Sequence, residues 1–189
     1  MSGNVAQNIN SLGGEPVMLS VVGDDAAGDK LRALLEQNFV ATEHLISDSA
    51  RPTTRKTRVM SGHHHLVRVD YEKRQYLSQD VMEKLCIEME SLMPTCDGVV
   101  LQDYAKGVVS KELVAEVKSC AQRNGKRVMV DPHRTTPVHF YEGVNLIKPN
   151  FDEAKVLAGL NFDSFKDKPE TIKEIGKELI SKVGAEELV

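Results

Sequence analysis

Several features that mark secreted, membrane-spanning or nucleic-acid-binding proteins are absent from this chain. Its three cysteines, Cys86, Cys96 and Cys120, are an odd number at wide spacing, which argues against a disulfide framework or a CxxC metal site. No apolar run approaches the roughly 20 residues that a membrane helix needs, and the N-terminus lacks the layout of a signal peptide. The 24 Lys and Arg residues are scattered among 28 Asp and Glu residues, which argues against a nucleic-acid partner. These absences predict a cytoplasmic protein with no membrane or nucleic-acid partner.

What is present is the composition of a soluble globular protein. The chain has 189 residues, of which 41% are hydrophobic and 28% charged, enough for one medium domain with a core. From residue 97 onward, buried strands and helices alternate, which predicts an α/β fold whose parallel sheet is flanked by helices. The predicted strands are 16–22, 97–103, 126–130 and 144–147, with a further strand beginning at residue 187. The predicted helices are 4–12, 26–38, 78–93, 110–124, one that opens at Asn150, and 169–183.

Residues 52–70 interrupt this pattern. They contain two β-branched or alternating stretches, 53–61 and 65–69, with Gly62 between them, and this predicts a hairpin of short strands. An α/β sheet does not need such an insertion for itself, and excursions of this kind commonly form a lid over a ligand site. Lys56 and Arg58 are two residues apart, so they share one face of the strand and could grip a phosphate. The alternative is a solvated strand face.

The segment Lys148-Pro149-Asn150-Phe151-Asp152-Glu153 follows the last of the interior strands and opens a helix. Asn150 and Glu153 are three residues apart at the carboxyl end of that strand, the edge at which open α/β sheets bind ligands. An amide and a carboxylate there could hold the water shell of a magnesium ion and a phosphate. The alternative is a capping box, Asn-x-x-Glu, that only stabilises the helix.

Other acidic residues also follow predicted strands. Asp103 and Lys106 come directly after one strand and Asp131 after the next, and these positions suit contacts to sugar hydroxyls and phosphates. The alternatives are a weak local ion pair for the first two and turn capping for Asp131. Asp24 and Asp25, after the strand at 16–22, either face substrate or cap the next helix.

The order of these motifs resembles that of the ribokinase-like carbohydrate kinases. Asn-Val-Ala at 4–6, Gly13 and Gly23 match the first signature of that family in spacing. The chain is most similar to the heptose 7-phosphate kinases of ADP-heptose synthesis. The segments that carry this similarity are RPTTRKTRV (51–59), LVRVDYE (66–72), QDYAKGVVS (102–110), VMVDPH (128–133) and FYEGVNLIKPNFDEA (140–154).

The resemblance implies transfer of the ATP γ-phosphoryl group to a sugar hydroxyl in the presence of Mg²⁺. For this chain it implies the anomeric hydroxyl of heptose 7-phosphate, in a pathway that leads to lipopolysaccharide, and a homodimer that pairs through the lid. The substrate-binding residues that it implies are Gly3, Asn4, Lys56, Arg58, Asp103 and Lys106. The residues implied to face ATP and Mg²⁺ are Asp131, Asn150 and Glu153, with Glu153 reaching the metal through water.

The chain also departs from the family pattern. It contains no Gly-x-Gly-Asp motif, which in the family supplies the anion hole and the catalytic base, and His133 stands where a lysine is usual. We therefore expect residues 1–189 to be an incomplete kinase domain with a β lid at about 50–72, and the base to lie beyond Val189. Two alternatives stay open: a remnant that binds sugar phosphate or dimerises without catalysis, and a ribokinase-like kinase for another sugar, such as fructose 6-phosphate or a nucleoside.

Overall fold

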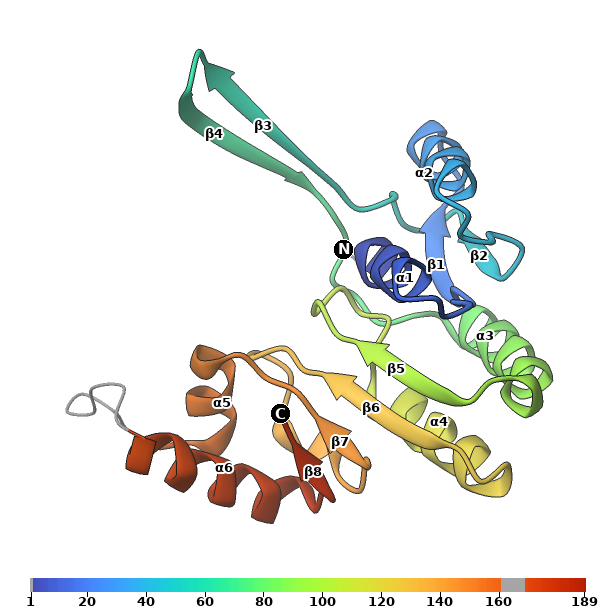
Figure 1. Ribbon diagram of the computed structural model, residues 1–189. Coiled ribbons are helices and arrows are strands. Elements are labelled where there is room, and N and C mark those ends of the chain that lie inside the picture. The colour runs from blue at the N-terminus through green and yellow to red at the C-terminus, as the bar shows by residue number, and fades with distance from the viewer. Residues whose placement is uncertain (1, 161–168) are drawn as a thin grey trace. The chain divides into compact units, whose positions relative to one another are not determined.

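The computed structural model describes residues 2–160 and 169–189, and it forms two compact units, Met1–Glu88 and Met89–Val189 (Figure 1). Each unit contains its own parallel strands. The predicted domain, 1–189, also includes positions outside the described residues. The elements of the first unit are α1 (Ser2–Ser11), β1 (Ser20–Gly23), α2 (Ala26–Gln37), β2 (Leu45–Asp48), β3 (Arg55–Ser61), β4 (His64–Tyr71) and most of α3 (Gln79–Leu92).

The first unit has its core around β1 and β2. These strands pair in parallel, from Ser20 opposite Leu45 to Gly23 opposite Asp48, and α2 connects them. The buried cluster consists of Ala6, Val22, Leu35, Val40 and Leu45. The strand expected at 16–22 is present as β1, but its predicted bounds were wrong, because it covers Ser20–Gly23. β2 was not predicted, because four residues are too few to show a period.

β3 and β4 form the predicted hairpin (Figure 1). They pair antiparallel from Arg55 opposite Tyr71 to Ser61 opposite His64, with a shift of register between Val59 and Met60. Gly62 has φ +57° in the connecting turn, a conformation that glycine adopts without steric cost. The side chains along both strands are mostly exposed. The hairpin is therefore a two-stranded ribbon that owes little to a buried core.

The second unit is a four-stranded parallel sheet in the order β5-β6-β7-β8. The strand at its C-terminal edge, β8, confirms the one expected from residue 187. The elements of this unit are η1 (Met93–Thr95), β5 (Gly98–Gln102), α4 (Lys111–Arg123), β6 (Arg127–Asp131), η2 (Val138–Tyr141), β7 (Leu146–Ile147), α5 (Phe151–Ala158), α6 (Pro169–Val183) and β8 (Glu187–Leu188).

The interior of this unit is apolar and its helices are capped by the residues that the sequence provides. Ser110 accepts from the Leu113 amide at the start of α4, 3.1 Å away, and α5 ends at Gly159, which is left-handed with φ +67°. Helices α5 and α6 pack against each other. The buried side chains include Leu113, Val114, Val117, Val128, Val130, Ile147, Leu157, Leu179 and Val183. Among the described residues, no helix is long and apolar enough to cross a bilayer.

Candidate active site at the strand ends of the second unit

The carboxyl ends of β5, β6 and β7 bring together most of the residues predicted for this unit. The Asp103 amide donates to the carbonyl oxygen of Asp131 at 3.0 Å, so the segments that leave β5 and β6 are joined. The Lys148 ammonium, just after β7, lies 3.1 Å from Asp131 Oδ1. Parallel strands end at one edge of a sheet, and the connections there present their side chains to a common site.

At the start of α5 the structure contains the capping box. Asn150 Oδ1 accepts from the Glu153 amide and Glu153 Oε2 accepts from the Asn150 amide, both at 2.9 Å. The purely structural alternative is therefore real. Capping does not prevent the two side chains from binding a ligand, because each acceptor oxygen has a further lone pair and both bonds lie at the surface. The metal and phosphate roles of these two residues stay predictions.

Asp103 has a buried carboxylate, 5% exposed. Its Oδ1 accepts from the Ala105 amide at 2.7 Å, and its Oδ2 accepts from the Thr136 and Tyr141 hydroxyls, each at 2.6 Å. The Tyr141 oxygen accepts in turn from the His133 amide at 3.1 Å. This network fixes the turn after β5 to the loop after β6. Asp103 thus has a positioning role, and its contact with substrate stays a prediction.

The turn that carries Lys106 is held in an uncommon conformation. Ala105 has φ +51° and Gly107 has φ +79°; for a residue with a Cβ this left-handed region is unfavourable. The bond from Asp103 to the Ala105 amide stabilises the turn in the manner of an Asx turn. Lys106 is therefore presented by a turn whose shape is set by the buried carboxylate.

Tyr104 belongs to this site although the sequence analysis singled out only its neighbours. Burial raises the pKa of its phenol, and the charges of Asp131 and Glu153 raise it further. A phenol is protonated at neutral pH and can donate; in the structure the hydroxyl donates to Gln102 Oε1 at 3.2 Å. The sequence signal that could have identified Tyr104 is its position between Asp103 and Lys106 in the string Asp-Tyr-Ala-Lys-Gly.

In the first unit, Lys56 and Arg58 lie on one face of the lid hairpin, as their spacing indicates. The register places Lys56 opposite Asp70 and Arg58 opposite Arg68, and Arg68 Nε lies 3.0 Å from Asp70 Oδ1. This face therefore presents three cationic groups and one carboxylate. Such a set suits a phosphorylated ligand.

Arg51 does not join that face. Its guanidinium is 9% exposed, lies 3.0 Å from Asp48 Oδ2 and donates to the Gln75 carbonyl oxygen at 3.1 Å. The charge of Arg51 is therefore paired inside the fold, and Arg51 does not reinforce the lid cations. Asp25 caps α2 through the Gly28 amide, which was the structural alternative for that residue.

Gly3 and Asn4 occupy the first turn of α1. A Cβ at Gly3 would come within 3.0 Å of Leu35 Cδ2, so this turn packs closely on α2, while Asn4 is exposed. These two residues and the lid cations belong to the first unit, whereas Asp103 and Lys106 belong to the second. Their convergence on one substrate stays a prediction.

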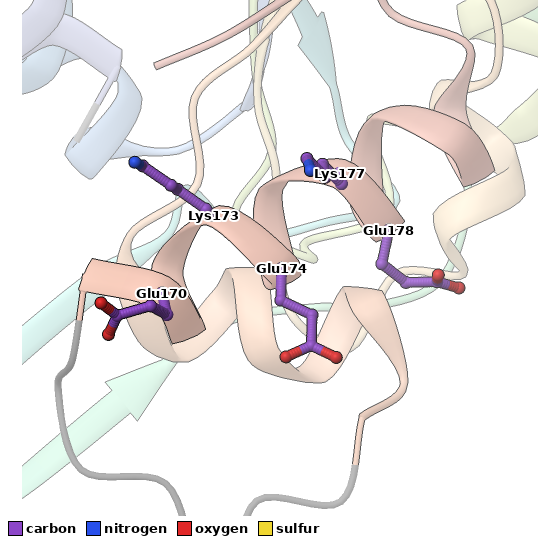
Figure 2. A pocket seen from close by; sticks show the side chains of 5 residues that line it. All are labelled: Glu170, Lys173, Glu174, Lys177 and Glu178. Carbon is purple, nitrogen blue, oxygen red and sulfur yellow. The ribbon is translucent and has the colours of Figure 1, made fainter.

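A depression on α6 is unrelated to these residues (Figure 2). Its lining consists of charged side chains only: Glu170, Lys173, Glu174, Lys177 and Glu178. In Figure 2 the lysines and the glutamates leave the helix in different directions instead of converging on one point. This is the solvated face of an amphipathic helix, and we assign it no ligand.

Parallel strands, an acidic strand-end site and a β hairpin define the class as an α/β kinase domain of the ribokinase-like type. The family model for pfkB family carbohydrate kinases matches residues 2–189, and the chain belongs to this family. Bifunctional protein HldE of Bradyrhizobium sp. (strain ORS 278) is 40% identical over 154 residues, which are 80% of this chain and 31% of that protein. The chain thus spans about a third of the length of this curated relative.

Solved structures agree on the fold. Arabidopsis thaliana ribokinase complexed with ribose and ATP superposes with a TM-score of 0.70 at 18% identity, covering 98% of this chain and 58% of that one. The tetrameric inhibited form of phosphofructokinase-2 from Escherichia coli gives 0.67 at 20% identity, covering 97% and 58%. The predicted family resemblance and the predicted ribokinase-like fold are both confirmed.

Proposed function

We propose that the protein transfers the γ-phosphoryl group of ATP to the anomeric hydroxyl of heptose 7-phosphate, toward ADP-heptose for lipopolysaccharide. The family is that of carbohydrate kinases, and the related ribokinase was solved with ribose and ATP. The observation that carries the proposal is the strand-end edge, where Asp131, Lys148 and the capped start of α5 lie together. The sugar assignment rests on the segments that resemble heptose 7-phosphate kinases.

The strand-end groups fit ATP phosphates with Mg²⁺. Magnesium prefers oxygen ligands, keeps several of its waters and uses few protein carboxylates, and Asp131 at the end of β6 and Glu153 in the first turn of α5 could supply carboxylate oxygens at this edge. When bound, the ion would neutralise phosphate charge. Lys148 contributes a cation at the same edge, and the α5 N-terminus adds the positive end of a helix dipole.

The lid cations fit the phosphate that the sugar already carries. Lys56 and Arg58 share one face of the hairpin, and we propose that they hold the 7-phosphate, while Gly3, Asn4, Asp103 and Lys106 serve the sugar end. The general base that a sugar hydroxyl needs is not assigned to any of these groups. A kinase for another phosphorylated sugar is the second candidate, because Lys56 and Arg58 would recognise any terminal phosphate.

The test is ADP release by the full-length protein with Mg-ATP and a panel of heptose 7-phosphate, unphosphorylated heptose, fructose 6-phosphate and a nucleoside. We expect turnover only with heptose 7-phosphate. Turnover only with fructose 6-phosphate would move the assignment to the second candidate, and no turnover with any member of the panel would favour a non-catalytic binding protein.

Glu153→Gln separates the proposed metal role from capping. Glutamine keeps an oxygen acceptor for the Asn150 amide, so α5 stays capped, whereas the negative charge is lost. We expect turnover to fall about 10- to 100-fold, as for other outer ligands of metal sites, with an unchanged melting temperature. Asp152→Asn is the matched control, because Asp152 is exposed and pairs with Lys155 at 2.8 Å. Equal turnover in the two variants would mean that Glu153 caps α5 and has no role at the metal.

A further inference from the structure

We propose that Asp25 and Thr53 are positioning residues that hold the lid hairpin at its root, and that sugar-phosphate affinity depends on them. This inference rests on the proposed function. Thr53 lies two residues before β3 begins, and Asp25 lies two residues after β1 ends. We assign neither side chain to the sugar phosphate, because both bind backbone amides and so act by positioning the chain.

The root is a set of bonds between side chains and backbone. Asp25 Oδ1 accepts from the Gly28 amide at 2.8 Å, and Oδ2 accepts from the Thr53 amide at 2.9 Å. The Thr53 hydroxyl oxygen accepts from the Gly23 amide at 2.9 Å. One carboxylate and one hydroxyl therefore join three segments: the end of β1, the first turn of α2 and the chain that enters the lid. We call these residues the lid root.

The segments at the lid root are in direct backbone contact. A Cβ at Gly23 would lie 2.4 Å from the Thr53 nitrogen and 2.7 Å from the Arg51 carbonyl oxygen. A Cβ at Gly28 would lie 2.5 Å from the Gly23 carbonyl oxygen. Glycine is required at both positions because the backbones approach too closely for any side chain. The chain that enters the lid is thus seated against the strand end.

The chain that leaves the lid is tied to the same place. Arg51 donates to the Gln75 carbonyl oxygen at 3.1 Å, and the Lys73 ammonium donates to the Ala50 carbonyl oxygen at 2.6 Å. Both ends of the hairpin are therefore fixed together, while β3 and β4 themselves are largely exposed. The direction in which Lys56 and Arg58 face follows from how the root is held.

The charge state of Asp25 supports this arrangement. The backbone and hydroxyl of Thr53 and the Gly28 amide hold the pKa of the Asp25 carboxyl below its ordinary value. The residue is therefore ionised at neutral pH, and charge-assisted bonds of this kind are stronger than neutral ones. Each of its two oxygens already accepts a bond within the root, which fits a positioning role better than direct contact with substrate.

The test compares Thr53→Val with Thr54→Val in the full-length protein. Valine at 53 keeps the shape and removes the hydroxyl, whereas Thr54 is the exposed neighbour and serves as the matched control. We expect Thr53→Val to speed amide exchange at residues 50–54 and 72–76 about fivefold. We also expect the KM for sugar phosphate to rise about five- to tenfold, with kcat and the KM for ATP nearly unchanged. Thr53→Ser should restore both readouts.

Two further results would decide against the proposal. The proposal fails if amide exchange in Thr53→Val is no faster than in Thr54→Val. It also fails if kcat falls while the KM values for sugar phosphate and ATP rise together, since that pattern indicates general unfolding. Asp25→Asn serves if Thr53→Val does not fold, because its amide keeps one acceptor oxygen and loses one of the two bonds. If the protein phosphorylates none of the sugars, the proposed function fails, and the exchange comparison alone then decides whether the root holds the hairpin.

Discussion

At the scale of single residues, the buried carboxylate of Asp103 organises the strand-end site. It accepts from two hydroxyls and one amide, and its partner Tyr141 is fully buried. Buried polar groups of this kind are stable only while every partner is present. The positions of Tyr104 and Lys106 therefore depend on Thr136 and Tyr141, the hydroxyl partners of Asp103, to which we assign no ligand.

Tyr141→Phe tests this dependence. The substitution removes one donor to Asp103 and the acceptor of the His133 amide, and we expect the free energy of unfolding to fall by about 1–3 kcal/mol. Urea titration followed by circular dichroism measures it. Tyr76→Phe, at a side chain that is 59% exposed, is the control and should change the free energy little. An equal effect of both substitutions would mean that the buried network contributes nothing specific.

Tyr141 also predicts how stability responds to alkali. Burial first, and then the Asp103 carboxylate, raise the pKa of this phenol above its ordinary value of 10.0. The folded state keeps the proton where the unfolded chain has lost it, so the contribution of Tyr141 is complete below about pH 10 and is lost as the pH rises further. We expect unfolding free energies measured across this range to fall more steeply for the wild type than for Tyr141→Phe. Parallel slopes would contradict the assignment.

At the scale of secondary-structure elements, the long periodic segments were predictable and the short ones were not. The helices at 26–38, 110–124 and 169–183 appear within about two residues of their expected ends, because apolar period and caps agree there. The strand β2 was not predicted, because its four residues show no hydrophobic period. The partners of Asp103 come from 33 and 38 residues further along the chain, so no local pattern indicated that its carboxylate is buried. The burial of Arg51 escaped prediction for the same reason, since Gln75 lies 24 residues away.

Helix α6 packs on the core of the second unit, and two substitutions test the contribution of its buried face. Leu179 is 0% exposed, whereas its neighbour Ile180 is 36% exposed. We expect Leu179→Ala to lower the free energy of unfolding by about 2–5 kcal/mol, because it removes buried methyl groups and leaves a cavity. Ile180→Ala, the same kind of truncation on the outer face, should cost clearly less. Guanidinium titrations of both variants give the comparison, and equal losses would show that α6 does not pack through Leu179.

At the scale of the whole molecule, the exposed faces of the lid hairpin suggest assembly. Opposite the cationic face lie Val59, Val67, Val69 and Tyr71, each at least 39% exposed. We propose that a second copy of this chain covers the apolar face, because the face is part of a strand pair and the charge of its Arg55 already lies over the ring of Tyr71, at 4.4 Å from the centroid.

Val67→Asp measures this proposal by sedimentation velocity. A charge in the centre of the apolar face should convert the dimer to a monomer, because an unpaired carboxylate cannot be buried in such an interface without a large penalty. Arg58→Asp places the same side chain on the opposite face of the hairpin and should leave the dimer intact. A wild-type protein that sediments as a monomer, or equal dissociation of both variants, would rule out this interface.

The lid root also determines the entropy that is lost when the hairpin closes as a loop. The bond from Arg51 to Gln75 closes a loop of 24 residues at its base. The entropy lost on closing such a loop grows only with the logarithm of its length, so doubling the loop adds about 0.6 kcal/mol. Residues inserted at the turn around Gly62 therefore leave the closure almost unaffected. The length of the hairpin and its attachment to the end of β1 can therefore change independently of one another.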